Sequence, residues 1–199
     1  MSFNFTKKII MKKSILLVLF TICSTLCVSA QNEVKIDTSK SLVKWTGSNL
    51  FKFNKHFGTV KFKDGNFIKT ESKITGGEFT IDMNTIINTD GKYNEMLIWH
   101  LKNQDFFDVE KHPFSYLKIK TVTYQSEKEI NIKADLTIKE ITKTIDFSAT
   151  IKNNQMISKF IIDRTLWNIN YESKGILGSI KDDIISDAIE FEVILNTTK

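Results

Sequence analysis

The 199-residue chain has few of the residues that cross-link or kink a protein. It holds two cysteines, Cys23 and Cys27, and a single proline, Pro113. Both cysteines lie in the first 30 residues, so the rest of the chain offers no disulfide and no thiol for catalysis or metal binding. Stability must therefore come from an ordinary apolar core, which a chain of this length can bury.

The first 30 residues have the pattern of a secretory signal peptide. Four lysines lie among residues 7–13, an apolar stretch covers 14–27, and Val28-Ser29-Ala30 supplies small residues for cleavage. We expect cleavage after Ala30, which leaves residues 31–199 as one domain in the periplasm or outside the cell. A retained anchor is the alternative, although 14–27 is short of the roughly 20 residues that span a bilayer. Met11 is an alternative start.

The chain also lacks an excess of one charge once this leader is set aside. Four of its 28 basic residues lie in the leader, which has no acid, so 24 basic residues face 23 acidic ones. Binding to nucleic acid depends on a clear basic excess. The charge balance therefore predicts no nucleic-acid partner.

Catalytic and metal-binding motifs are missing from the sequence as well. It contains no nucleophile elbow, phosphate-binding loop or dinucleotide-binding glycine motif. His56, His100 and His112 are scattered, without the spacing of paired metal ligands. Asp105 and Asp108 flank two phenylalanines, and we expect them to cap a turn rather than to form an acid–base pair. We predict no catalytic residue, no metal site and no cofactor.

What the sequence does have is a repeated two-residue rhythm. Apolar residues occupy alternate positions over 130–138 and again over 145–151, with polar residues between them, and similar runs surround Val43, Val60, Phe79 and Ile189. Successive strand side chains point to opposite faces, so each run predicts a strand with one apolar face. About eight such runs predict an all-β fold, with an antiparallel sheet curved around a single apolar interior.

One segment departs from this rhythm. From Tyr93 onward, Met96, Leu97, His100 and Leu101 follow the spacing of one face of a helix. The spacing predicts one short helix over about 93–104. Lying near one end of a barrel, such a helix would act as a lid or plug.

Residues 100–113 read His-Leu-Lys-Asn-Gln-Asp-Phe-Phe-Asp-Val-Glu-Lys-His-Pro. This stretch resembles the YceI-like family of polyisoprenoid-binding periplasmic proteins, in which a His-Leu pair, an Asp-Phe-Phe-Asp stretch and a strand-opening Pro follow in that order. The resemblance covers essentially all of residues 31–199. Further stretches resemble the family in chain order: Gly58-Thr59-Val60-Lys61-Phe62, Asp135-Leu136-Thr137-Ile138, and Asp163-Arg164 followed by Trp167-Asn168-Ile169. The last of these resembles a strand of the family.

The resemblance implies an eight-stranded, lipocalin-like antiparallel barrel with an elongated apolar pocket. Family members bind long isoprenoid or other lipid chains, such as polyprenyl phosphates and isoprenoid quinones. It therefore implies a secreted or periplasmic protein that transports, stores or sequesters such a lipid, without stable membrane insertion; a homodimer is left open. Burying a hydrocarbon tail contributes about 0.8 kcal/mol per methylene, so the tail can supply most of the affinity.

The predicted ligand contacts come from strand parity and from the helix. His100 is either a core histidine or a polar contact at the pocket mouth. Arg164, the single arginine, either pairs with an acid or meets an anionic headgroup, because an unpaired inward charge would be costly. The predicted ligand-binding residues are Trp45, Phe62, Phe79, Ile81, Leu97, His100, Leu101, Phe114, Leu117, Phe147, Phe160, Arg164 and Trp167.

Two other classes of protein remain as alternatives. One is an enzyme that acts on a lipid or a small molecule and uses the same barrel. The other, which the sequence favours less, is a small outer-membrane barrel, since eight strands of about ten residues would suffice. The absence of evident paired aromatic girdles argues against the second alternative.

Overall fold

The computed structural model describes residues 31–49, 54–91, 94–172 and 185–198. The expected leader lies outside these described residues. Strands dominate the described part of the chain, as the alternating pattern predicts. In chain order the elements are β1 (Gln31–Lys35), β2 (Leu42–Ser48), β3 (Lys55–Thr70), β4 (Lys73–Asn88), α2 (Asn94–Lys102), β5 (Phe114–Tyr124), β6 (Glu129–Ile138), β7 (Ile141–Lys152), β8 (Gln155–Asp163), the 3-10 helix η1 (Arg164–Trp167) and β9 (Ala188–Asn196).

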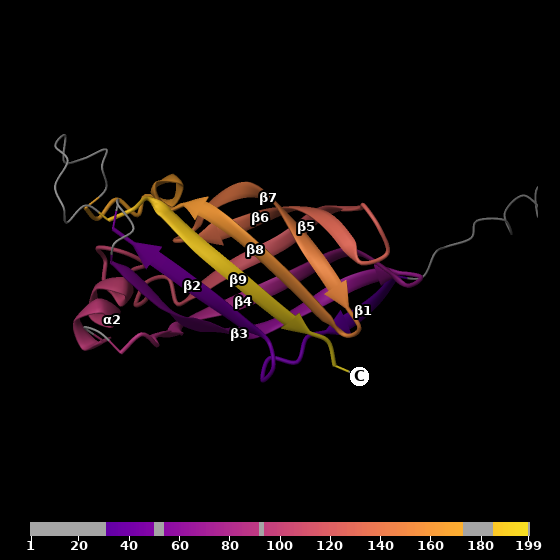
Figure 1. Cartoon of the computed structure of the whole chain (residues 1–199), viewed down its shortest axis with the longest axis horizontal. Helices are drawn as coiled ribbons and strands as arrows, with labels where there is room; N and C mark the ends of the chain where they lie inside the picture. The colour runs from indigo at the N-terminus through magenta and orange to yellow at the C-terminus, as the bar shows by residue number, and fades with distance from the viewer. Residues whose placement is uncertain (1–30, 50–53, 92–93, 173–184, 199) are drawn as a thin grey trace, which may run out of the picture. The chain divides into compact units, whose positions relative to one another are not determined.

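Eight of the strands close into a barrel (Figure 1). The strand order is β3-β2-β9-β8-β7-β6-β5-β4, and antiparallel pairing of β3 with β4 completes the ring. β1 is a ninth strand at the edge, beside β3. The predicted eight-stranded antiparallel barrel with one helix is confirmed, and the helix covers Asn94–Lys102 within the predicted span.

Irregular pairing between β3 and β4 changes which residues face inward. The register shifts between Thr59 and Lys61 and again between Phe62 and Asp64. Such bulges insert a residue and reverse the alternation beyond them. Phe62 is therefore buried at an even position and Phe67 at an odd position of the same strand. A strict two-residue count would assign the far half of β3 to the wrong face.

The two ends of the barrel are built differently. At one end lie α2, the turns that follow it, and η1, close to where β2 ends and β3 begins (Figure 1). At the opposite end, near the β3–β4 and β5–β6 turns, the core includes the buried side chains of Phe67, Ile74, Ile130 and Ile132. We call these four side chains the packed end.

β8 ends earlier than the sequence suggests. The family resemblance places Trp167 and Ile169 on a strand, but the strand stops at Asp163 and η1 follows. The Asp163 carboxylate accepts hydrogen bonds from the backbone N–H and the hydroxyl of Thr165, at 2.9 and 2.6 Å. This local capping competes with the sheet ladder, and Asn168 then takes a left-handed conformation with φ 57°.

The outer wall of the barrel carries cross-strand ion pairs. Glu192 on β9 lies between Lys44 of β2 and Lys159 of β8, at 3.3 and 3.4 Å. Lys118 of β5 lies 2.6 Å from Glu78 of β4. The polar members of the alternating runs therefore face outward, as their parity predicts.

Candidate functional site

An apolar cavity occupies the barrel interior. The space open to the centre of a water-sized sphere is about 140 Å³, and nearly all of its lining is apolar. Every barrel strand from β2 to β9 contributes to the lining, and α2 contributes Leu101. Since an apolar space of this kind offers almost nothing to bind water, it suits an apolar guest.

Nine of the thirteen predicted ligand-binding residues line this cavity. Seven of them come from strands far apart in the chain and share inward parity, whereas Leu101 comes from α2 and Arg164 from η1. The nine are Trp45, Phe62, Phe79, Ile81, Leu101, Leu117, Phe147, Phe160 and Arg164. Whether each touches a ligand stays a prediction.

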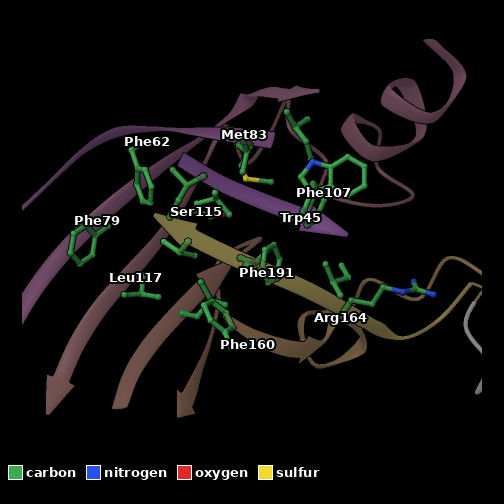
Figure 2. A pocket seen from close by; sticks show the side chains of 18 of the residues that line it. Trp45, Phe62, Phe79, Met83, Phe107, Ser115, Leu117, Phe160, Arg164 and Phe191 are labelled. Carbon is green, nitrogen blue, oxygen red and sulfur yellow. The ribbon is translucent and has the colours of Figure 1, made fainter. Parts of the chain in front are cut away.

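Aromatic side chains cross one side of the cavity wall. Phe147 stacks on Phe160 with ring centroids 4.7 Å apart, and Phe160 lies 5.6 Å from Phe191. Phe191 pairs with Phe160 on one side and with Trp45 on the other. The three phenylalanines are only half-buried although they face inward, because their rings border the cavity. Figure 2 shows Phe160 and Phe191 on this wall. We call the wall formed by these four residues the hollow side.

Two of the predicted residues on the helix pack beside the cavity without lining it. Leu97 packs against the core. The His100 ring lies 5.3 Å from the ring of Tyr171, and its Nδ1 lies 3.6 Å from a carboxylate oxygen of Asp105. His100 therefore sits among neighbours at the helix end of the barrel, outside the cavity lining.

Trp167 also lies outside the cavity lining. It is fully buried, with 0% of its surface exposed, and its Nε1 donates a hydrogen bond to the Leu136 carbonyl at 3.2 Å. Its indole is thus satisfied by the protein itself. Its place in η1 rather than on a strand explains why parity did not place it correctly.

Phe114 has the wrong parity for a ligand contact. It pairs with Asp82, while the next residue, Ser115, is buried and lines the cavity. Phe114 and Leu117 are three positions apart, so a regular strand sends them to opposite faces. The inward set of β5 is Ser115, Leu117 and Ile119.

Sequence reasoning missed two buried serines in the lining, Ser115 and Ser158. Their polarity hid them, because the search followed apolar side chains. Ser158 could have been found by parity, since it stands between Met156 and Phe160 on the inward face of β8. The lining also includes Met83 and Val193, which follow the same parity.

Arg164 has its own partners at the helix end of the cavity. Its guanidinium donates to the carbonyls of Ser186, Ile169 and Ile185 at 3.1, 2.8 and 3.3 Å. One nitrogen also lies 3.4 Å from an Asp187 oxygen. Burial lowers the pKa of Arg164, while the charge of Asp187 opposes that shift. The partner that an inward arginine requires is therefore present, and it consists mainly of backbone carbonyls.

The two phenylalanines after the helix close this end. Phe106 and Phe107 are buried and line the cavity, with their rings 5.3 Å apart. Asp108 accepts a hydrogen bond from Lys111 at 3.0 Å within the following turn. Asp105 faces His100 instead. The two carboxylates are thus engaged by different partners.

The three histidines do not gather into a metal site. Within the described ranges, no group of three or more His, Cys, Asp or Glu side chains is placed to hold a metal ion. His56 pairs with Asp90 at 2.7 Å, and His112 lies 3.7 Å from Glu140. Each histidine therefore has a separate carboxylate neighbour.

These features define a closed antiparallel barrel with an apolar interior cavity. The chain belongs to the YceI-like domain family, whose family model matches residues 34–196. The resemblance noted in the sequence is thereby confirmed.

A bacterial relative matches part of the chain. A UPF0312 protein of Pseudomonas putida (strain W619) is 30% identical over 122 residues, which cover 59% of this chain and 61% of the relative. The match therefore spans about three-fifths of that protein's length.

Solved structures share the fold at low sequence identity. The crystal structure of Burkholderia cenocepacia BcnA matches with a TM-score of 0.58 at 18% identity, covering 82% of this chain and 99% of BcnA. A polyisoprenoid binding domain from Saccharophagus degradans matches with a TM-score of 0.57 at 11% identity, covering 82% of this chain and 96% of that domain. These likenesses establish the barrel architecture.

Proposed function

We propose that this protein is a periplasmic or secreted binding protein that holds one long-chain isoprenoid, or another lipid, in its barrel cavity. The observation that carries the proposal is the apolar cavity inside the barrel, which Trp45, Phe147, Phe160 and Phe191 border. Its role would be transport, storage or sequestration of the lipid.

The physical chemistry of the cavity supports an apolar chain as the guest. Each buried methylene contributes about 0.8 kcal/mol, so a tail of a few isoprene units needs little polar recognition. The rings of Phe147, Phe160 and Phe191 on the hollow side are half-buried in the ligand-free protein, and a bound ligand would cover their exposed part. The Saccharophagus degradans domain with the same fold is a polyisoprenoid binding domain, which supports the same ligand class here.

The outer surface supports an aqueous location for the barrel. Lys44, Glu192 and Lys159 form a charged row across three neighbouring strands. Among the described residues, no helix is both long and apolar enough to cross a membrane. Together with the leader-like pattern of residues 1–30, the charged wall favours the periplasm or the cell exterior.

The interior favours binding over catalysis. The polar side chains that line the cavity include Ser115, Ser158 and Arg164. Arg164 is engaged by backbone carbonyls, and in the described part of the cavity lining neither serine has a histidine or carboxylate beside it to act as a base. A lipid would thus be held without being transformed.

Native mass spectrometry tests the proposal. The full chain is produced in a Gram-negative bacterium, recovered from the periplasmic fraction and weighed intact, and its ligand is then extracted and identified. We expect a protein of residues 31–199 that carries one apolar molecule. An unprocessed chain in the membrane fraction would contradict the location. A folded, empty barrel that also rejects added isoprenoids would contradict the function.

A matched pair of serine variants provides the control. Ser158→Leu places a bulky apolar side chain in the cavity and should reduce ligand occupancy. Ser148→Leu makes the same change at an exposed position of β7 and should leave occupancy unchanged. Equal occupancy in both variants would place the ligand outside the cavity.

A further inference from the structure

Trp45 carries a polar group that the protein itself leaves unused. Its side chain lines the cavity with only 6% of its surface exposed, and its indole Nε1 has no hydrogen-bond partner in the described part of the structure. A buried N–H without an acceptor is costly, and buried tryptophans normally find one. Trp167 shows the normal case, because its Nε1 donates to the Leu136 carbonyl.

The surrounding backbone holds the Trp45 indole in place. Trp45 on β2 pairs directly with Gly58 on β3. A Cβ atom at Gly58 would come within 2.7 Å of the indole ring and would overlap the carbonyl oxygen of Ile87. The glycine therefore allows the ring to lie close against β3. From this position the ring forms part of the cavity wall (Figure 2).

We propose that the Trp45 N–H is the donor that recognises an uncharged carbonyl oxygen carried by the apolar ligand. This inference rests on the proposed function, since it names the polar group of the molecule held in that cavity. The feature that Trp45 would recognise is a single neutral carbonyl oxygen on an otherwise apolar chain. That oxygen supplies the acceptor which the buried indole lacks, and the hydrocarbon chain fills the apolar remainder of the cavity.

The charges around the cavity favour a neutral group over a phosphate at this position. Arg164 is the only cationic residue that lines the described cavity. Its guanidinium donates to three backbone carbonyls and extends away from the labelled aromatic rings (Figure 2). A diphosphate beside Trp45 would therefore be buried without a free counter-charge, which is far more costly than burying a carbonyl oxygen.

Three probes that share a farnesyl chain separate these possibilities. Farnesylacetone carries a ketone, farnesene is a hydrocarbon, and farnesyl diphosphate is charged. Dissociation constants are measured for the full chain, for Trp45→Phe, and for Trp99→Phe as the control. Trp99 lies exposed on α2 and does not line the cavity. Thermal melts confirm that each variant is folded.

We expect Trp45→Phe to weaken farnesylacetone binding about 3- to 10-fold, the loss expected for one neutral hydrogen bond. Farnesene binding should change less than about twofold, because the apolar contacts remain. The control variant should bind both probes like the parent protein. Equal weakening of ketone and hydrocarbon would overturn the inference, and so would tighter binding of farnesyl diphosphate than of farnesylacetone to the parent protein.

The infrared carbonyl stretch of bound farnesylacetone is a second readout. A hydrogen bond should move this band to lower wavenumber in the parent protein, relative to the ketone in a hydrocarbon solvent, and Trp45→Phe should reverse the shift. An unshifted band in the parent protein would overturn the inference even if Trp45→Phe failed to fold. If farnesene binds and farnesylacetone binds no more tightly than farnesene, only this inference fails. If neither probe binds, the proposed function fails with it.

Discussion

The packed end and the hollow side belong to the same barrel wall but use their aromatic residues in different ways. Phe67 in the packed end is 1% exposed, and its ring meets that of Phe79 at 5.1 Å. Phe160 on the hollow side has close ring neighbours too, yet it remains half-buried because it borders the cavity. Residues of one chemical type therefore stabilise the fold at one place and leave room for a guest at another.

Backbone geometry explains why the packed end fills completely. Phe79 pairs with Gly65, and a Cβ atom at Gly65 would approach the Phe79 ring to 2.5 Å. Without that side chain, the ring can lie close to β3 and reach Phe67. The hollow side instead places large residues at directly paired positions, Trp45 beside Phe191 and Phe191 beside Phe160. Rings in such a row pack along the wall rather than across the barrel.

Alanine substitution should show the difference between these regions most strongly. Phe67→Ala should lower the free energy of unfolding by about 3–5 kcal/mol, since it removes a fully enclosed ring. Phe191→Ala should cost at most half as much, because that ring already borders empty space and has fewer contacts to lose. Urea unfolding of the ligand-free variants measures both. Equal losses would mean that the cavity is filled in solution.

Arg164 tests how far the helix end of the cavity depends on polar contacts. Arg164→Met should lower the free energy of unfolding by about 3 kcal/mol, because three carbonyls lose their donor. Arg164→Lys should restore little of it, since an ammonium cannot reproduce the planar fork. Urea unfolding of both variants provides the measurement. Full rescue by lysine would show that the charge alone matters.

Adding volume should cost more stability in the packed core than at the cavity. Ala134 is fully buried and lies outside the cavity lining, so Ala134→Leu should cost about 1–3 kcal/mol through overpacking. Ser158→Leu should cost less than 1 kcal/mol, roughly within the range of a tolerated swap, because the cavity receives the added atoms. Thermal unfolding of both variants measures the loss of stability, and equal losses would contradict this prediction.

Changes on the outer wall should have the smallest effect on stability, and this effect should depend on pH. A hydrogen bond from Thr144 at 2.7 Å lowers the pKa of Asp135, and the nearby Lys120 adds to this shift. A lowered folded pKa gives stability that is present above the unfolded value of about 3.9 and is lost as pH falls through the folded value. As the pH falls from 5 to 2, the urea concentration at the unfolding midpoint should therefore decrease less steeply for Thr144→Val than for the parent protein. Identical slopes for the two proteins would show that the hydrogen bond to Asp135 does not contribute to the pH dependence of stability.

The sequence predicted the fold well where the strands are regular. β6 and β7 carry unbroken alternation, and their pairing follows it without a register shift. Phe114 was assigned to the wrong face because it lies three positions before Leu117, and a regular strand sends two such residues to opposite faces. The turn at Asp163 forms because a side-chain hydrogen bond to the backbone competes with strand pairing. The alternation of apolar and polar residues does not show which of the two is more stable.

The site was predictable in part for the same reasons. Inward parity selected Trp45, Phe147 and Phe160, and all three line the cavity. It could not reveal that the Trp45 N–H lacks an acceptor while the Trp167 N–H has one. Whether a carbonyl of a distant strand lies within reach of an indole depends on the folded structure. The carbonyls that hold Arg164 come from two separate segments and were equally invisible.

The pairing of β7 with β8 is much shorter than that of β8 with β9. It covers four positions, from Ala149 opposite Ser158 to Lys152 opposite Gln155, whereas β8 and β9 pair over nine. The β8 side of residues 141–148 therefore has no ladder partner in the described chain, as at the edge of an open sheet. Such edges recruit strands from other molecules unless something covers them. η1 lies against β7, with Trp167 anchored to β6. The turn that shortens β8 thus also places η1 beside β7, where it would hinder the docking of a foreign strand.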